Sequence, residues 1–478
     1  MQWISGFFAR VVKQTRRSLG LVSTGAIVAV GLILLRDTGA LQPLEWLVLD
    51  YGLTWAAPNY PDDRLLLVTI DDRDVEKLGH YPLYDQDLAH AITILKGSDP
   101  VAIGLNIYRN FSAPPGSTQL LQVIEQTPEL VVVEPGTPAF NRSPLAALTP
   151  EQQGIDNILV DRDGRVRRAL LAYRSIVPAP LGTSPDLKQS LATRLALRYL
   201  QSQKRSTYAW TDQSLQWGNN RIFPLQRNSG GYVNLNPTGF QILLLSWQSL
   251  DQFDRVSLTD LLMGAVPADR IRGRIVLLGT VSPLHGPFFQ TPRRSSPDLL
   301  MASGLEIQAN TIIQLLALAE GLSPLQGWSD PLEYLWILLW SMVGSSLAAL
   351  GQFRMACNLK ESEFPDSLQN PPDRGQDLGQ DSLGQDLGKN LGQDSLGQNL
   401  GQNLGKNLGQ DFGQRSSSYV WIATAITLIL AGGSVLAIHQ GLWLPALPAI
   451  LSLWGSISAP GLVFCPRAAT SPTFAETI

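Results

Sequence analysis

The stretch Leu65-Leu66-Leu67-Val68-Thr69-Ile70, followed at once by Asp71-Asp72, decides the fold that this sequence predicts. A short apolar run that ends in carboxylates is typical of a strand that is buried on both faces and has polar groups at its carboxyl end. A helical repeat of apolar residues follows between residues 85 and 97, and a second apolar run extends from Val101 to Tyr108. A strand, a helix and a strand in this order predict two parallel strands that are neighbours in one sheet.

Further segments continue the same pattern much later in the chain. Glu129 to Glu134 is a third short apolar run, and Arg274 to Val281 is a fourth that ends in a glycine turn. Gly304 to Asn310 then opens another amphipathic helix. The sequence therefore predicts an α/β domain with a mainly parallel sheet flanked by helices.

A set of short motifs, taken in order and with their spacing, resembles the type-two CHASE domain, an extracytoplasmic sensory module of bacteria. The resemblance covers about Leu41 to Gly321. Its motifs are Val68-Thr69-Ile70-Asp71-Asp72, Tyr81-Pro82, Gly104-Leu105-Asn106-Ile107, Gly273 to Thr280, Thr291-Pro292 and Gly304 to Asn310. The resemblance implies a sensory domain of the kind that membrane helices join to cyclases, histidine kinases or protein kinases inside the cell.

Three positions differ from the pattern that this family often shows. The chain has Asn106 where relatives often have an aspartate, Gln308 where they have a histidine, and no arginine near Tyr84-Asp85. If those polar groups contact the signal in relatives, this protein senses a different signal or none.

Four apolar spans indicate a membrane protein, and only 16% of the residues are charged, fewer than in ordinary soluble proteins. The first span, Leu19 to Leu35, follows four basic residues, as both anchors and signal peptides do. The run is longer than the apolar region of a usual signal peptide and Thr38-Gly39-Ala40 is a poor cleavage site, which favours a retained anchor. Later basic residues lie between the second and third spans and after the fourth. The positive-inside rule therefore predicts four crossings of the plasma (inner) membrane, with both termini cytoplasmic and the main domain extracytoplasmic.

The predicted organisation follows from these spans. Its segments are a cytoplasmic basic N-terminus (residues 1–18), a first transmembrane helix (19–36), the extracytoplasmic sensory domain (37–330), a second transmembrane helix (331–350), a cytoplasmic loop (351–418), two further transmembrane helices (419–438 and 442–464) and a short cytoplasmic tail (465–478). Within the loop, residues 375–414 repeat Leu-Gly-Gln-Asp or Leu-Gly-Lys-Asn. A glycine beside each leucine favours disorder over a helix there.

The exported domain carries four further local signals. Leu41 to Tyr51 predicts a helix leading off the membrane, and Leu187 to Leu200 predicts an amphipathic helix. Asn157 to Tyr173 predicts a β-hairpin that turns at Asp161-Arg162-Asp163-Gly164, and Gly231 to Pro237 predicts a further strand and turn. The Asp-x-Asp-Gly tetrad also opens calcium loops, but the rest of that loop pattern is missing, so the hairpin turn is the preferred interpretation.

The candidate ligand-binding residues are Asp71, Asp72, Asn106, Gly279 and Thr280. They follow or end the predicted strands, and open parallel sheets bind ligands outside the carboxyl ends of their strands. The alternative interpretation is that the two aspartates only cap a helix or turn, and that the glycine only makes a turn. The sequence leaves both interpretations open.

Several classes of function lack their sequence signals. The four histidines have no metal-ligand spacing, and no nucleophile elbow, phosphate-binding loop, or kinase or cyclase signature occurs. No basic stripe interleaves with aromatic residues. The sequence therefore predicts no catalytic residue, no metal site, no cofactor and no nucleic-acid partner.

The predicted function is a multi-pass membrane sensor of an unknown small-molecule or physical signal, with no enzymatic output of its own. Only Cys465 to Ile478 follow the last span, so the expected route of signalling is a partner in the lipid bilayer, such as a membrane-bound kinase or cyclase. Gly344, Ser345 and Ser346 permit close helix approach and are the candidates for that coupling, unless they pack the protein's own helices. A membrane scaffold or accessory subunit is the alternative; a transporter component is less favoured, because the spans hold almost no ionisable groups.

Overall fold

The computed structural model describes most of the chain. The described residues are 23–56, 62–109, 111–134, 148–174, 187–204, 208–211, 213–245, 248–292, 301–361 and 420–463. Contacts divide the chain into two compact units. We call Leu35–Glu333 together with Ala431–Leu447 the sheet unit, and the remainder the helical unit. The predicted Leu-Gly repeats, basic N-terminus and cytoplasmic tail lie outside the described residues.

Six parallel strands form the main sheet, in the order β12-β1-β13-β2-β3-β4. Their bounds are β1 Leu65–Ile70, β2 Ala102–Asn106, β3 Leu130–Glu134, β4 Gln153–Ile155, β12 Arg255–Ser257 and β13 Ile275–Thr280. The predicted parallel sheet is confirmed. The prediction that β1 and β2 are neighbours is wrong, because β13 pairs with both of them and lies between them.

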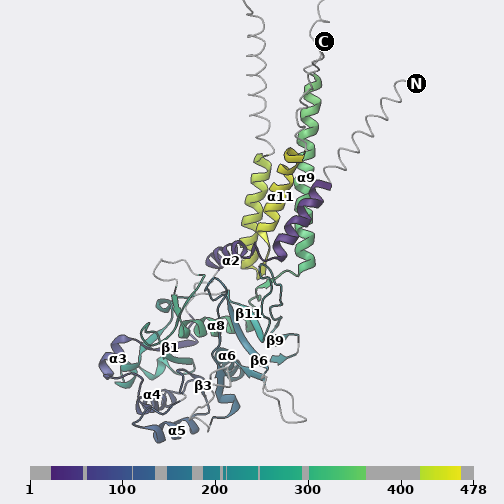
Figure 1. Ribbon diagram of the computed structural model, residues 1–478. Coiled ribbons are helices and arrows are strands. Elements are labelled where there is room, and N and C mark those ends of the chain that lie inside the picture. The colour runs from purple at the N-terminus through teal and green to yellow at the C-terminus, as the bar shows by residue number, and fades with distance from the viewer. Residues whose placement is uncertain are drawn as a thin grey trace, which may run out of the picture. The chain divides into compact units, whose positions relative to one another are not determined.

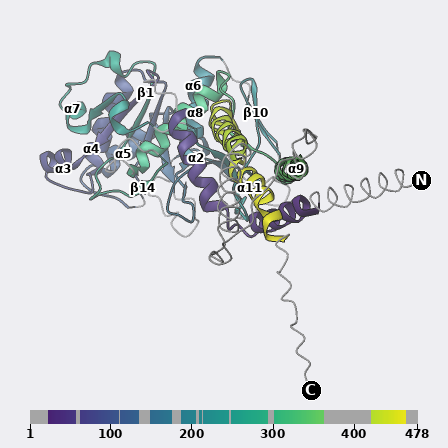
Figure 2. The same cartoon turned by 90° about the horizontal axis from the view of Figure 1, so that it is seen from above.

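Helices cover both faces of this sheet, as Figures 1 and 2 show. On one face lie α4 (Asp85–Gly97), α5 (Ser117–Glu125) and α7 (Leu258–Leu262); on the other lie α6 (Leu191–Ser202) and α8 (Gly304–Ala319). Leu65 and Leu67 of β1 point into the core beside α6 and α8, whereas Leu66, Val68 and Ile70 point into the opposite core. The run from Leu65 to Ile70 is unbroken because both faces are buried.

The remaining predicted elements agree with the structure in part. The hairpin is confirmed, with β5 (Ile158–Leu159) antiparallel to β6 (Arg168–Arg174). The helix predicted from Leu187 instead begins at Leu191, because β7 (Leu187–Gln189) pairs with β6 and the Ser190 hydroxyl accepts from the N–H of Thr193 as the helix cap.

Two further predictions need correction. Gly231 to Pro237 is not a strand; apart from one bridge between Ser229 and Tyr232 it is a loop that leads to β11 (Phe240–Leu243). The helix α8 was predicted to be amphipathic, but most of its residues are buried, since β13, α6 and neighbouring loops surround it.

Short elements complete the sheet unit. They are α2 (Gln42–Ala56), α3 (Asp72–Leu78), β8 (Tyr208–Trp210), β9 (Leu215–Trp217), β10 (Asn220–Ile222), β14 (Phe288–Gln290), β15 (Met301–Ser303), β16 (Gln326–Gly327) and β17 (Leu442–Trp443). The helix α2 confirms the element predicted for Leu41 to Tyr51. The parallel pair β16 and β17 brings residues from beyond the second candidate span into this unit.

The described residues contain two helices long and apolar enough to cross a membrane, Asp330–Gly351 within α9 (Asp330–Glu361) and Val420–His439. The helix Ser23–Asp37 counts as a candidate membrane span only if it is taken together with Gln42–Thr54, and the chain bends by 82° between the two helices. Two or three candidate spans therefore replace the four that were predicted.

The fourth predicted span, 442–464, is not among these candidates. Its first residues form β17, and α11 (Ala446–Val463) begins after Pro445. The apolar helix that remains, Ala446–Ser458, is shorter than the two candidate spans. Hydropathy alone did not separate the strand from the helix, because both are apolar.

Candidate functional site

Three of the predicted ligand-binding residues meet at the carboxyl edge of the main sheet. Gly279 lies opposite Asn106 on one side and opposite Thr69 on the other. Thr280 pairs with Ile70, and its hydroxyl donates to the Ile70 carbonyl at 3.3 Å. The insertion of β13 between β1 and β2 therefore places Asn106, Gly279 and Thr280 side by side.

The two aspartates after β1 are engaged in local hydrogen bonds at the same edge. Asp71 is the N-cap of α3: its Oδ1 accepts from the N–H of Asp74 at 2.9 Å, and its own N–H donates to Asp74 Oδ2 at 3.1 Å. The Asp72 carboxylate accepts from the hydroxyl of Ser282, in the loop after β13. The geometry of Asp71 is that of a helix cap; a ligand-binding role for either aspartate stays a prediction.

Gly279 allows two elements to approach each other closely. A Cβ atom at this position would lie 2.7 Å from Cδ1 of Leu305 and 3.0 Å from the carbonyl oxygen of Asn106. A larger residue would require the Leu305 side chain or the end of β2 to shift. Gly279 therefore allows the first turn of α8 to pack directly against these strand ends.

The sequence interpretation missed the acidic residue of this edge, Asp156. It follows directly after β4, and its carboxylate accepts from Nε2 of Gln308. Asn106 at the end of β2 also acts on this carboxylate. β4 is only three residues long, and its partner on α8 lies 152 residues away, so no local pattern marks Asp156.

Burial of its carboxyl group raises the pKa of Asp156 to about 7, and the amides of Gln308 and Asn106 only partly oppose this rise. The residue as a whole keeps some exposed surface, as Asn106 does. Tyr108, whose side chain is 45% exposed, lies near enough for the Asp156 charge to add to the rise in its own pKa, which is caused first by burial. The group is thus an ionisable acid at the rim of the domain.

The fold also supplies an arginine where the sequence lacks one nearby. Arg109 is buried, and its guanidinium lies 3.9 Å from Oδ1 of Asp85 and donates to the Leu83 carbonyl. The sequence has no arginine near Tyr84-Asp85, but the fold brings Arg109 to this place from further along the chain.

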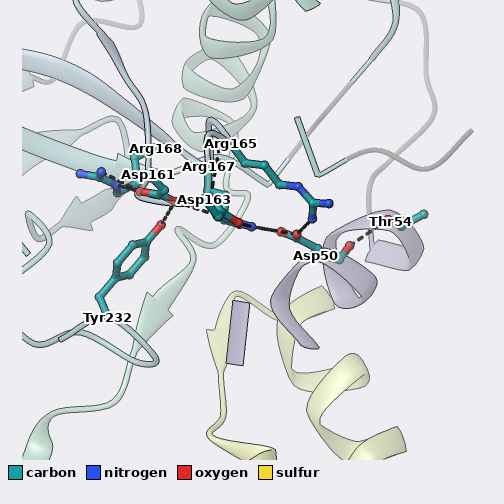
Figure 3. Close-up of polar contacts among 8 residues, drawn as sticks. All are labelled: Asp50, Thr54, Asp161, Asp163, Arg165, Arg167, Arg168 and Tyr232. Atoms are coloured by element: carbon teal, nitrogen blue, oxygen red, sulfur yellow. Dashed lines mark hydrogen bonds and ion pairs between the residues drawn. The ribbon is translucent and has the colours of Figure 1, made fainter. Parts of the chain in front are cut away.

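A second polar cluster ties α2 to the β5–β6 hairpin (Figure 3). Arg167, the residue before β6, donates from Nε to Asp50 Oδ1 at 2.6 Å and from Nη2 to Asp50 Oδ2 at 2.9 Å. These two hydrogen bonds form a bidentate ion pair between the hairpin and α2. It also donates to Asp161 at 3.0 Å and to Asp163 at 2.6 Å. We call Asp50, Asp161, Asp163, Arg165, Arg167, Arg168 and Tyr232 the hairpin cluster.

Further contacts extend the hairpin cluster. Arg168 donates to Asp161 Oδ1 at 2.7 Å, and the Tyr232 hydroxyl donates to Asp161 Oδ2 at 2.7 Å. Arg167 stacks over the Trp46 ring at 4.9 Å, which adds a cation–π contact. Burial works against the charge on Arg167, but the hydrogen bonds that it donates to Asp50 and Asp163 outweigh this effect and raise the pKa of its guanidinium. The Arg167 guanidinium therefore keeps its charge at physiological pH.

The helix α2 has two distinct faces. Trp46, Leu49 and Leu53 are buried in an apolar core with Tyr232 and Trp443. Leu44, Leu47 and Tyr51 are 47%, 40% and 44% exposed on the other face. The inner face of α2 belongs to the sheet unit, and its outer face leaves apolar groups uncovered.

Comparison with known families identifies the architecture. Residues 26–346 match the family model described as the CHASE2 domain. This chain belongs to the CHASE2 family. The CHASE2 match begins within the helix Ser23–Asp37 and ends within the candidate span Asp330–Gly351, so it extends beyond the predicted Leu41 to Gly321 on both sides. Searches of curated proteins and of solved structures found no match.

The predicted signal-coupling residues of this CHASE2 protein lie in the helical unit. Gly344 and Ser345 are buried, and a Cβ atom at Gly344 would lie 2.9 Å from Cβ of Ser456 on α11. Ser346 is exposed, and its hydroxyl donates to the Met342 carbonyl at 2.8 Å. Two of the three small residues therefore pack the protein's own helices, and Ser346 points outward from them.

No group of three or more His, Cys, Asp and Glu side chains in the described part of the CHASE2 protein is arranged to hold a metal ion. Around Asp156 the carboxyl edge offers one carboxyl, the amides of Gln308 and Asn106 and the phenol of Tyr108, which recognise ligands by hydrogen bonds and charge.

Proposed function

We propose that this protein is a multi-pass membrane sensor whose CHASE2 domain receives a small-molecule or physical signal outside the cytoplasm and passes it to a partner in the membrane. The observation that carries the proposal is the extent of the family match, which starts and ends inside candidate membrane helices. A sensory domain placed between two such helices can pass a change of its own shape to both. The proposed role is non-catalytic.

The hairpin cluster supports a mechanical link between the domain and its membrane side. Asp50 lies on α2, the first helix after Ser23–Asp37. Arg167 directly precedes β6, which pairs with β5, β7 and β11 of the sheet unit. Their side chains are only 2% and 1% exposed. A buried bidentate ion pair holds two elements in one geometry, so a shift of the hairpin moves α2 with it.

The outer face of α2 supports a position at the membrane surface. Leu44, Leu47 and Tyr51 recur at helical spacing and are exposed, and an apolar stripe with a tyrosine suits the boundary between headgroups and acyl chains. The bend of 82° after Ser23–Asp37 allows α2 to run along the surface if that helix enters the bilayer.

The proposed orientation is tested by labelling introduced cysteines with a membrane-impermeant thiol reagent in intact cells. Ser202→Cys lies in the proposed extracytoplasmic domain and is expected to react, whereas Ser416→Cys lies in the proposed cytoplasmic loop and is expected to react only after the membrane is permeabilised. Equal labelling of both positions in intact cells contradicts the orientation.

Signalling through a partner, such as a membrane-bound kinase or cyclase, is tested by crosslinking in native membranes. A photo-reactive residue at the exposed Ser346 is expected to capture another membrane protein. The matched control is Ser341, which is fully buried and bonds to Ser452 of the same chain, and it is expected to give intramolecular products alone. Intramolecular products from Ser346 as well contradict coupling at this face and favour a scaffold or accessory subunit.

A further inference from the structure

The buried polar group at the carboxyl edge of the sheet is incomplete in its hydrogen bonds. Within the described residues, Oε1 of Gln308 is a buried atom without a hydrogen-bond partner. Nδ2 of Asn106 is buried and makes no hydrogen bond of good geometry to any of these residues, although its amide lies close enough to Asp156 to stabilise the carboxylate. Gln308 is only 5% exposed, and its other amide atom, Nε2, is directed to Asp156. An amide held in this way presents Oε1 as a fixed acceptor beside a carboxylate.

The charge of Asp156 is also uncompensated. The groups that act on it are the amides of Gln308 and Asn106, and none of its described neighbours is a cation. Buried carboxylates in proteins are normally paired with a positive charge or with a metal, because desolvation makes an isolated charge costly. Asp50 and Asp161 follow that rule, because both pair with Arg167. Among the described residues Asp74 is buried without an ion pair, but it accepts from the N–H of Asp71 and from the N–H and hydroxyl of Thr259. In the same part of the chain, the only hydrogen bond of good geometry to Asp156 comes from Gln308.

We propose that Asp156, Gln308 and Asn106 bind a small molecule that carries a protonated primary amine next to a hydrogen-bond acceptor. The ammonium group donates to the Asp156 carboxylate and to Oε1 of Gln308, and the acceptor of the ligand takes the N–H of Asn106. The aromatic ring of Tyr108, at the exposed rim, adds a π face of the kind that favours organic cations. This inference rests on the proposed sensory function and names its class of ligand.

The position of the site fits the topology of the domain. Asn106 ends β2 and Asp156 follows β4, so both stand at the carboxyl edge of the parallel sheet, where open α/β sheets bind ligands. Gln308 reaches the same edge from α8, whose close approach Gly279 permits. Three segments that are distant in the sequence thus meet at one ligand, and a ligand that joins them biases how α8 sits on the sheet.

The test uses the purified full chain in detergent at pH 8, with ethanolamine as the probe and ethylene glycol as its neutral counterpart. Ethanolamine is expected to raise the temperature of thermal unfolding in a saturable way, and ethylene glycol and potassium chloride at the same ionic strength are expected to leave it unchanged. Asp156→Asn keeps the shape of the side chain and removes its charge, so it is expected to weaken ethanolamine binding at least tenfold.

Two further variants make the result decisive. Gln308→Met, which removes the acceptor at similar volume, is expected to weaken binding as well, whereas Asp269→Asn, at a side chain that is 85% exposed elsewhere on the domain, is expected to bind as the wild type does. An equal response of wild type and Asp156→Asn, or an equal response to ethylene glycol, overturns the proposal. That outcome leaves the sensory function standing, because crosslinking from Ser346 tests it independently.

Discussion

Replacement of Arg167 by methionine removes the one side chain that contacts three carboxylates of the hairpin cluster. Asp50 and Asp161 are 2% and 1% exposed, so they remain buried after their principal cation is lost. Breaking a buried ion pair on one side costs about 3–5 kcal/mol, because the partner charge stays desolvated and unpaired. Arg165 still reaches Asp50, and Arg168 still reaches Asp161, so the lower end of that range is expected.

In a domain of this size each kcal/mol lowers the unfolding temperature by roughly 2–4 °C, so Arg167→Met is expected to lower it by at least about 6 °C. Thermal unfolding of the full chain in detergent, followed by tryptophan fluorescence, measures the effect, and Trp46 reports locally because the Arg167 guanidinium lies over its ring.

The matched control is Arg165→Met, since Arg165 is 27% exposed and pairs with Asp50 alone. Its expected cost is below about 1 kcal/mol, as for other solvent-screened pairs. A loss for Arg167→Met no greater than that of Arg165→Met refutes the reasoning that the buried ion pair holds α2 to the hairpin. Asp50→Leu combined with Arg167→Met is expected to regain part of the loss, because it removes both charges together.

Three other predictions follow from the contacts. Gly344→Ile is expected to cost about 1–3 kcal/mol by separating α9 from α11, whereas Ser346→Ile on the exposed side is neutral; the yield of folded protein in detergent and its unfolding temperature measure both. Asp71→Ala removes the cap of α3 and is expected to lower stability by about 1 kcal/mol, seen as a lower unfolding temperature. The pKa of Asp156 is raised from its ordinary value of 3.8 to about 7 in the folded state, which therefore holds this proton more tightly than the unfolded state does. As the pH rises from 4 to 7, the free energy of unfolding of the wild type is expected to fall by up to about 4 kcal/mol relative to that of Asp156→Asn. Parallel pH profiles of the two proteins contradict this assignment.

The strands of the main sheet could be predicted because their burial on both faces leaves a local mark. Leu65 to Ile70 and Ile275 to Thr280 are apolar except for Thr69 and Thr280, with no alternation to confuse with a surface strand. Their lateral order could not be predicted, since every apolar run of this kind is equally suited to the centre of a sheet. The position of β13 is decided by contacts with β1 and β2 that no local pattern contains.

Some residues of the candidate site could be predicted from the sequence, and others could not. Asn106, Gly279 and Thr280 stand at strand ends, and strand ends are visible in the sequence as the points where apolar runs stop. Asp156 was missed because β4 is too short to show a run, and its significance comes from Gln308 on a distant helix. The hairpin turn was predicted correctly, but Asp161 and Asp163 were interpreted only as turn residues; their buried partners Arg167 and Asp50 depend on tertiary packing.

The place of β13 in the sheet has a consequence for how the domain is made. Ile70 and Thr280 lie side by side but are 210 residues apart in the chain. During synthesis from the N-terminus, β1 and β2 are translated long before β13, the strand that lies between them. Until β13 is made, β1 and β2 each have one edge unpaired. Unpaired apolar strand edges invite aggregation, and contacts between distant segments form slowly. The sheet can close only after most of the domain has been translated, and its early half depends until then on its helices, or on chaperones, to cover the gap.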